Sequence, residues 1–382
     1  MDNNNFIKHI TLENYKSIKK LDLELKPLNV LIGSNGAGKS NFISFFNLTL
    51  KVLNGTAKTY IIKQGGIDYF LNYGVKHSKA IEASIFTANN FGIELEINPT
   101  NDLMTPYIHH RYINLDDKEK SNSLIVQQRP DLYLKFAMDI INPKQKFSME
   151  RVNSEQRVPT GYNDRKYHIL KNNIQTFHFN DTSDTSPLKA TVANNDNLFL
   201  RADGQNLACM IKLIYDKYPE YYKMIVDTIR NVVPDFHDFV IRHNSEFLSL
   251  EWFNKNNVDI PWKAHYLSDG SLRFIALAVL LLMPSELQPQ VIIVDEPEIG
   301  LHPTALNVLS GLIKRASLER QVIISTQSAE LLSQFEPDDV IVVDKKDKYS
   351  EFKRLSNHDL AKWLENYTLG ELWETNVIGG RP

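Results

Sequence analysis

The sequence of 382 residues predicts an α/β fold with a parallel sheet and an inserted polar lobe. A short apolar strand at 28–32 runs into a glycine-rich turn and then into a helix that begins near Lys39. Further along the chain, predicted strands and a predicted helix alternate as strand–helix–strand units do. These later elements are the strands 291–295, 321–326 and 339–344 and the helix 303–317.

Before the glycine-rich turn, apolar and polar residues alternate at 6–13 and 20–26, which predicts two half-buried strands. A similar alternation over 81–97 predicts a hairpin. Two helices are expected at 205–233 and 271–283, the second being strongly apolar. The stretch between these halves is polar and lacks sustained heptads, so we interpret it as an insertion and not as a coiled coil. The predicted division is an N-terminal part of the main domain at 1–99, an inserted lobe at 100–200 and a C-terminal part at 201–382.

Composition narrows the class of protein. The 43 Lys and Arg residues against 46 Asp and Glu residues give a formal net charge of -3, so any DNA binding would need a local basic patch. Cys209 is the only cysteine, which excludes an internal disulfide. The N-terminus lacks the apolar core of a signal peptide, and the apolar run 274–283 is too short to span a membrane. We therefore expect a cytoplasmic protein without a membrane partner.

The glycine-rich turn fits the phosphate-binding motif G-x-x-x-x-G-K-[ST] in full. Its glycines let successive backbone N–H groups point at phosphate oxygens, and the following helix N-terminus favours negative charge. Lys39 is predicted to reach the β- and γ-phosphates of ATP, and the Ser40 hydroxyl to ligate Mg²⁺. The predicted nucleotide-binding residues of this motif and its first neighbour are Gly33, Ser34, Asn35, Gly36, Ala37, Gly38, Lys39, Ser40 and Asn41.

The strand 291–295 ends in two carboxylates, Asp295 and Glu296. Carboxylates at the end of a buried strand are costly unless cations or water meet them. Beside a phosphate-binding loop, Asp295 is expected to complete the Mg²⁺ shell. Glu296 is the predicted general base that accepts a proton from the attacking water.

Two further polar turns complete the predicted site. Ser268, Asp269 and Gly270 precede the apolar helix. A serine cap and exposed N–H groups there could form a second anion site, or Ser268 could simply cap the helix N-terminus without binding a ligand. Gln327 follows the strand 321–326 and could orient the attacking water or only cap that strand. We expect Glu296, Gln327 and Lys39 to be the catalytic residues.

Taken in chain order, these motifs resemble those of P-loop NTPases of the ABC type, namely the ATPase heads of RecF, the SMC proteins and the OLD-family ATPases. Leu267–Ser271 would be the signature motif, although Asp269 and Ser271 depart from its transporter form. Glu13–Ile18 resembles the start of this class, and Glu298–Pro303 resembles its D-loop. More narrowly, the chain resembles a compact bacterial family of RecF/OLD-like AAA ATPases. Further stretches that carry this narrower resemblance are 65–68, 177–183, 198–206, 325–332 and 369–373.

The resemblance implies a head that forms a homodimer around two ATP molecules, with Ser268, Asp269 and Gly270 facing the partner's phosphate-binding loop. The stretch after the last predicted strand is too short for the Toprim nuclease domain of OLD proteins. A nuclease-like effector is therefore expected as a separate protein subunit. Families of this build occur in phage defence and DNA maintenance, which makes DNA a candidate partner.

Two weaker assignments and two rival functions stay open. Lys16 could reach a phosphate or be a solvated lysine, and Gln64 could sense Mg²⁺ and the γ-phosphate or be an ordinary turn residue. A non-catalytic scaffold that binds ATP and sequesters an effector or nucleic acid is the alternative function. A transporter-type ATPase subunit is disfavoured by the altered signature and the long polar insertion.

Overall fold

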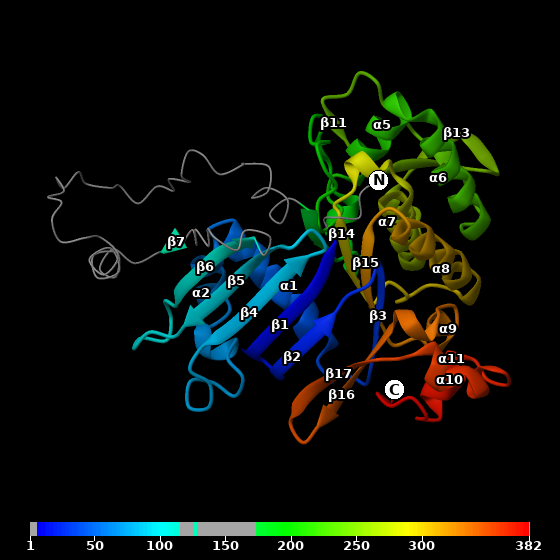
Figure 1. Cartoon of the computed structure of the whole chain (residues 1–382). Coiled ribbons are helices and arrows are strands. Elements are labelled where there is room, and N and C mark those ends of the chain that lie inside the picture. The colour runs from blue at the N-terminus through cyan, green and yellow to red at the C-terminus, as the bar shows by residue number, and fades with distance from the viewer. Residues whose placement is uncertain (1–5, 115–125, 128–172, 382) are drawn as a thin grey trace, which may run out of the picture.

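The computed structural model describes residues 6–114, 126–127 and 173–381. At its centre lies a sheet with the strand order β17-β16-β3-β15-β14-β8 (Figure 1). All neighbouring strands in it are parallel except β17, which pairs antiparallel with β16. This arrangement confirms the predicted α/β class. The strands are β3 (Leu28–Ile32), β8 (Ile174–Phe177), β14 (Val291–Asp295), β15 (Gln321–Thr326), β16 (Val340–Lys346) and β17 (Tyr349–Arg354).

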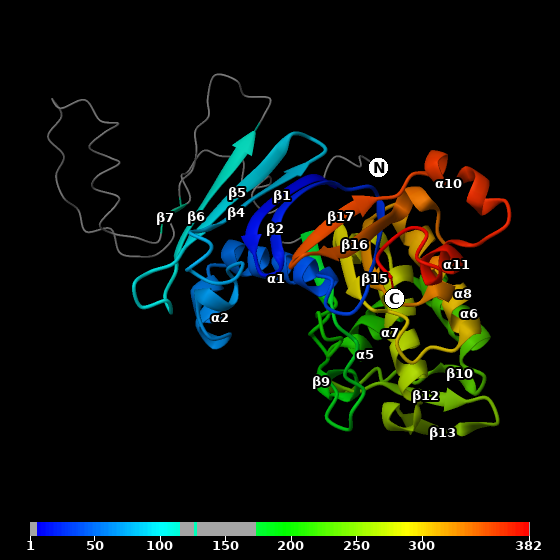
Figure 2. The same ribbon diagram turned by 90° about the horizontal axis from the view of Figure 1, so that it is seen from below.

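A second, antiparallel sheet has the order β2-β1-β4-β5-β6-β7. It covers the helix α1, and Figure 2 shows it on the same side of the central sheet as that helix. Its strands are β1 (Ile7–Tyr15), β2 (Ile18–Glu24), β4 (Ile81–Thr87), β5 (Phe91–Asn98), β6 (Tyr107–Asn114) and β7 (Val126–Gln127).

Helices cover both faces of the central sheet, and the strands supply apolar residues to each face in turn. Ile293 and Ile323 pack with α1 and the antiparallel sheet. Ile292 and Ile324 point to the opposite face and pack with the helices α5 to α8 (Figure 1). The helices are α1 (Lys39–Leu53), α2 (Ala57–Lys63), α5 (Leu207–Lys217), α6 (Pro219–Val232), α7 (Asp269–Leu282), α8 (Pro303–Ser317), α9 (Ala329–Leu332), α10 (Asn357–Leu364) and α11 (Leu369–Glu374).

Two small sheets lie beyond α5 and α6 in Figure 1. Their strands are β10 (Phe236–Phe239), β12 (Glu251–Asn254) and β13 (Asn257–Lys263) in one, and β9 (Val192–Ala193) and β11 (Phe247–Leu248) in the other. Among the described residues, no helix is both long and apolar enough to cross a membrane.

The expected helix at 205–233 needs correction in detail, and the structure adds strand pairings at the described ends of the expected lobe. The helix expected at 205–233 is two helices, α5 and α6, because Tyr218 leaves the helical conformation before Pro219 opens α6. The described ends of the expected lobe at 100–200 also pair with strands outside it. β6 extends the antiparallel sheet beside β5, and β8 joins the central sheet beside β14. Residues 115–125 and 128–172 of that lobe lie outside the described part of the chain.

Candidate functional site

The glycine-rich turn lies at the carboxyl end of β3 and leads directly into α1. Gly38 caps this helix with φ of 123°, in a region that favours glycine, and a Cβ there would clash with the hydroxyl of Ser350. Ser350 in turn donates to the carbonyl oxygen of Ala37. The turn therefore packs closely against β17, while Asn35, Gly36 and Ser40 stay exposed on its other side.

The ammonium group of Lys39 is held inside this turn. Its side chain is buried, and Nζ donates to the carbonyl oxygens of Gly33, at 2.5 Å, and Ser34, at 3.2 Å. Desolvation lowers the pKa of Lys39, and the negative charges of Glu296, Asp295 and Glu298 oppose that shift. The carboxylates that follow β14 are therefore close enough to the phosphate-binding turn to act electrostatically on Lys39.

The acidic residues follow β14, the second strand from β3, and β15 lies between the two strands. Asp295 is the last residue of β14, and its carboxylate accepts a hydrogen bond from the Ser325 hydroxyl on β15. Glu296 has φ of 50°, which is uncommon for a residue other than glycine. Its backbone N–H donates to the Ser325 carbonyl at 3.0 Å. Backbone strain of this kind gathers at functional sites, where surrounding contacts hold it in place.

Gln327 joins the two strand ends. Its side-chain Nε2 donates to Oε1 of Glu296, so Gln327 and the predicted general base are in direct contact. Because β15 also pairs with β3, Gln327 leaves the sheet between the phosphate-binding turn and the acidic strand end.

Glu298, the first residue of the stretch that resembles a D-loop, is a further member of this site. Its Oε1 accepts from the Thr326 hydroxyl and from the backbone N–H of Gln327, each at 2.7 Å. Its Oε2 is buried and has no hydrogen-bond partner among the described residues, and burial raises the pKa of this carboxyl group. The position of Glu298 three residues past a strand end is the only local sign of its place in the site. Its contact with Thr326 and Gln327 could not be predicted, because these partners are far away in the sequence.

His178 also lies at this edge of the sheet. Phe177 pairs with Val294, which places His178 beside Asp295 where both strands end. Partial burial lowers the pKa of His178, and the charge of Asp295 opposes this effect. The end of β8 therefore adds His178 to the site, next to the carboxylates that follow β14.

The two predicted Mg²⁺ ligands are both oxygen donors: the hydroxyl of Ser40, in the first turn of α1, and the carboxylate of Asp295, at the end of β14. The described residues contain no group of three or more His, Cys, Asp or Glu side chains that could enclose a metal. A small oxygen donor set suits Mg²⁺, which is usually bound by one or two protein ligands together with phosphate oxygens and water. The residues present therefore fit the predicted ion.

The predicted signature turn is a helix cap with an exposed outer face. Ser268 caps α7 by accepting from the Ser271 N–H at 3.2 Å, and Ser268 and Asp269 are exposed. Gly270 packs so closely against Gly300 that a Cβ would clash with the Gly300 carbonyl. Among the described residues, no hydrogen bond joins this turn to the phosphate-binding turn of the same chain.

Arg273, one helical turn further along α7, holds this region together. Its guanidinium donates to the carbonyl oxygens of Ile299, at 2.8 Å, and Asn180, at 2.6 Å. These two bonds connect the signature helix to the segment after β14 and to the segment after β8.

Of the remaining predicted residues, Lys16 and Asn41 make contacts within the chain and Gln64 is exposed. Lys16 donates to the Ser44 hydroxyl at 3.1 Å and lies over the rings of Tyr15, Tyr69 and Phe70, where burial lowers its pKa. Asn41 donates to the Ser17 hydroxyl at 2.7 Å and so braces the turn from behind. Gln64 is an exposed residue that ends α2.

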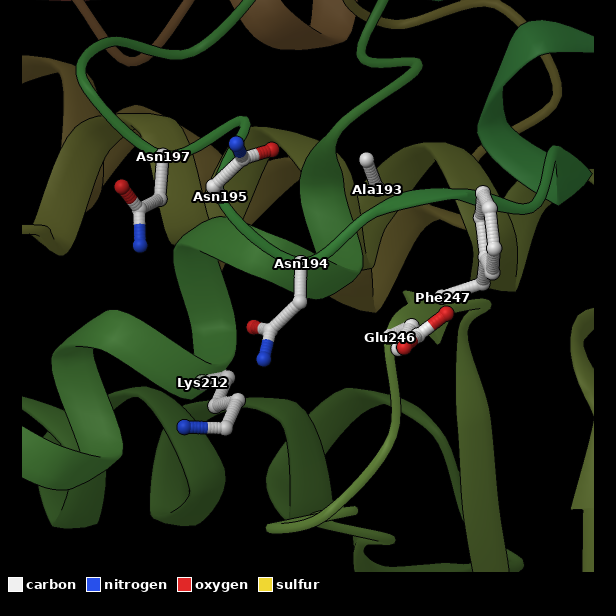
Figure 3. A pocket seen from close by; sticks show the side chains of 7 residues that line it. All are labelled: Ala193, Asn194, Asn195, Asn197, Lys212, Glu246 and Phe247. Carbon is white, nitrogen blue, oxygen red and sulfur yellow. The ribbon is translucent and has the colours of Figure 1, made fainter.

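A separate cavity of about 550 Å³ lies near α5, away from all of these residues (Figure 3). It is lined by Ala193, Asn194, Asn195, Asn197, Lys212, Glu246 and Phe247. Its one ammonium group, that of Lys212, already pairs with Asp216. None of the predicted site residues lines this cavity.

Comparison with solved structures identifies the fold. An Smc head bound to the C-winged helix domain of ScpA has 16% sequence identity to this chain and a TM-score of 0.57, over 93% of this chain and 99% of that one. A Pyrococcus furiosus Smc head with an extended coiled coil, bound to the C-terminal domain of ScpA, also has 16% identity, with a TM-score of 0.55 over 94% of this chain and 98% of that one. The fold is that of an ABC/SMC-type ATPase head.

Comparison with protein families gives one match to the sequence itself. The model described as "AAA domain, putative AbiEii toxin, Type IV TA system" matches residues 28–333, from the strand before the phosphate-binding turn to the end of α9. A search of curated proteins gave no match. Because the family model covers well over half of the chain, the protein belongs to this family of AAA domains related to the putative AbiEii toxins.

Proposed function

We propose that this chain hydrolyses ATP slowly to ADP and phosphate, and that two copies close around two ATP molecules. The contact between Glu296 and Gln327 is the observation that carries the proposal. It joins a carboxylate and an amide at the ends of neighbouring strands, beside the strand that leads into the phosphate-binding turn.

The proposed reaction assigns a role to each of these groups. A water molecule attacks the γ-phosphorus, and Glu296 accepts its proton while the bond to the β–γ bridging oxygen breaks and ADP leaves. Gln327 donates its amide to a phosphate oxygen and accepts from the attacking water. Lys39 balances charge on the β- and γ-phosphates. Ser40 and Asp295 would hold Mg²⁺, which neutralises developing negative charge when bound.

The exposed signature turn supports the proposed homodimer. Ser268 and Asp269 face outward on α7, and backbone N–H groups at a helix N-terminus favour a phosphate. We propose that Ser268 and Gly270 contact ATP bound by the partner chain. In this arrangement the nucleotide is part of the dimer interface.

The proposed biological role is control of a separately encoded effector in phage defence or DNA maintenance. Support comes from the family description, which names a toxin of a type IV toxin–antitoxin system. The two Smc heads of similar fold were crystallised with domains of a second protein, ScpA. By analogy, we propose that this head binds a protein partner.

Glu296→Gln tests the catalytic part of the proposal. This substitution keeps the size of the side chain but removes the base, so the variant should bind ATP, hydrolyse it at least ~100-fold more slowly and accumulate ATP-bound dimer. ATPase rates and light scattering with ATP present measure the two effects. Glu330→Gln, at an exposed position on α9, is the matched control. Hydrolysis by Glu296→Gln at the wild-type rate would show that Glu296 is not the base.

A further inference from the structure

Three segments that are distant in the sequence meet behind the phosphate-binding turn and bring lysine and tyrosine side chains together. They are the start of β2, the loop that precedes β4, and the tip of the β16–β17 hairpin. Figures 1 and 2 both show this hairpin lying beside β2. We call the side chains that meet there the lysine–tyrosine cluster: Lys19, Tyr73, His77, Lys348 and Tyr349.

Direct contacts define the cluster. The ammonium group of Lys348 lies 4.7 Å from the ring centre of Tyr73 and 5.6 Å from that of Tyr349. The ammonium group of Lys19 lies 4.9 Å from the ring centre of Tyr349. The two tyrosine rings are 5.8 Å apart, and the Tyr73 hydroxyl donates to the Lys348 carbonyl at 2.8 Å. The rings therefore fix two ammonium groups in position without neutralising either.

The surroundings of the cluster are also rich in lysine. Exposed lysines flank it on all three segments, at Lys20, Lys76, Lys79, Lys345 and Lys346. Of these, Lys20 pairs with Glu13 at 3.0 Å and Lys346 with Glu351 at 3.7 Å. Asp344 and Asp347 lie on the same hairpin. Among the described residues, neither Lys19 nor Lys348 has a carboxylate partner, so the centre of the patch keeps its positive charge.

We propose that the lysine–tyrosine cluster binds single-stranded nucleic acid. Ammonium groups contact backbone phosphates, and exposed aromatic rings stack on unpaired bases. Tyr73 is 45% exposed and supplies such a ring beside Lys348. An acidic peptide would use the charges but not the ring, and a duplex hides the faces of its bases. This binding does not depend on the proposed ATPase activity.

A chain of hydrogen bonds connects the cluster to the phosphate-binding turn. Ser350, next to Tyr349, donates to the carbonyl oxygen of Ala37, and its hydroxyl oxygen is also hydrogen-bonded to the Ser17 hydroxyl at 2.7 Å. Asn41, in the first turn of α1, donates to the same Ser17 hydroxyl at 2.7 Å. A strand bound at the cluster would therefore contact the hairpin that supports the turn from behind.

The test is fluorescence anisotropy with a labelled single-stranded DNA oligonucleotide, with no ATP present. Replacing both Lys19 and Lys348 with alanine should weaken binding at least tenfold and reduce the log–log salt slope by about 1.4, since each phosphate that a lysine neutralises adds about 0.7 to that slope. Tyr73→Ala should weaken binding at least fivefold. A double variant, Lys217→Ala with Lys223→Ala, removes two exposed charges from α5 and α6 and should bind like the wild type.

Three outcomes would overturn the proposal. In the first, the cluster variant binds the oligonucleotide like the wild type, or the control variant loses as much affinity. In the second, the cluster variant loses affinity for ATP and not for the oligonucleotide, which would make the cluster part of the nucleotide site. In the third, a duplex of the same sequence binds more tightly and Tyr73→Ala changes neither affinity.

Discussion

At the scale of single residues, Gln327 is held at two points. Its side chain donates to Glu296, and its backbone N–H donates to Glu298. The residue is therefore fixed between two carboxylates, one of which is the proposed base. A glutamine held in this way can donate to a phosphate and accept from water without changing its charge.

This neutrality leads to a prediction about pH. Gln327→His would place a group with an ordinary pKa of about 6.5 beside the phosphates. As the pH falls from 8 to 6 the new side chain becomes a cation, so ATP affinity of the variant should rise by about threefold or more. Over the same pH range the affinity of the wild type should change less, since Gln327 stays neutral and the lowered pKa of His178 moves the titration of that side chain to more acidic values. ATP titrations by calorimetry measure both profiles, and parallel profiles would contradict the prediction.

Glu298 gives a second prediction at this scale. Glu298→Ala leaves the Thr326 hydroxyl and the Gln327 N–H without their acceptor, which costs about 1–3 kcal/mol for a buried group and releases Gln327. We expect kcat to fall about tenfold while KM for ATP changes less than about threefold. Glu298→Gln keeps an oxygen acceptor and should retain most activity. Equal losses in kcat for the two variants would show that the charge, and not the position of Gln327, is what matters.

The pKa of Glu298 adds a stability prediction. Burial raises this pKa in the folded state, so the stability that the protonated carboxyl contributes is fully present below the unfolded value of about 4.5 and is lost as the pH rises through the folded value. Glu298→Gln imitates the protonated form. The free energy of unfolding of the variant minus that of the wild type should therefore be larger at pH 7 than at pH 4. Chemical denaturation at the two pH values measures the difference, and a difference of the opposite sign would contradict it.

At the scale of elements, the segment that follows β14 connects the site to the signature helix. Glu298 contacts the end of β15, while the next residues, Ile299 and Gly300, contact Arg273 and Gly270 on α7. A shift of α7 would therefore be transmitted to Gln327 through three consecutive residues. The Arg273 bond to Asn180 extends the same connection to the end of β8.

Arg273→Lys tests this connection. Lysine keeps the charge, but one ammonium group cannot reproduce the two divergent bonds to Ile299 and Asn180. We expect ATP affinity of the monomer to be unchanged, while ATP-dependent dimerisation and kcat fall at least about fivefold. Lys314→Arg, on α8, serves as a control for the reverse exchange. The idea fails if Arg273→Lys weakens ATP binding and dimerisation equally.

The elements differ in how far the sequence could predict them. The strands β3, β14 and β15 and the helix α8 have the predicted bounds because short apolar runs and capping residues mark them locally. The place of β8 beside β14 could not be predicted, since a strand of four residues gives no local sign of its distant partner. For the same reason Glu298 and His178 gained roles only when the sheet order was known. The sequence leaves Lys16 open between a phosphate contact and a solvated lysine, and in the structure its ammonium group lies over aromatic rings.

At the scale of the whole molecule, one chain presents its phosphate-binding turn and its signature turn without a hydrogen bond between them among the described residues. The core on one face of the central sheet supports α1 and the first turn, and the core on the other face supports α7 and the second. In the proposed homodimer, a head of this build would be complementary to a second copy. A two-fold dimer would pair each phosphate-binding turn with a partner's signature turn at two equivalent sites.

A mixing experiment tests this arrangement. Lys39→Ala removes the phosphate contact, and Ser268→Arg blocks the signature turn, so each variant alone should be inactive. In a mixed dimer both defects fall in one site, and the other site combines the intact Lys39 of one chain with the intact Ser268 of its partner. If sites turn over independently and chains pair at random, an equal mixture should regain roughly one quarter of the wild-type ATPase rate. If each variant alone is inactive and the mixture stays inactive too, the two turns act within one chain and not across a dimer.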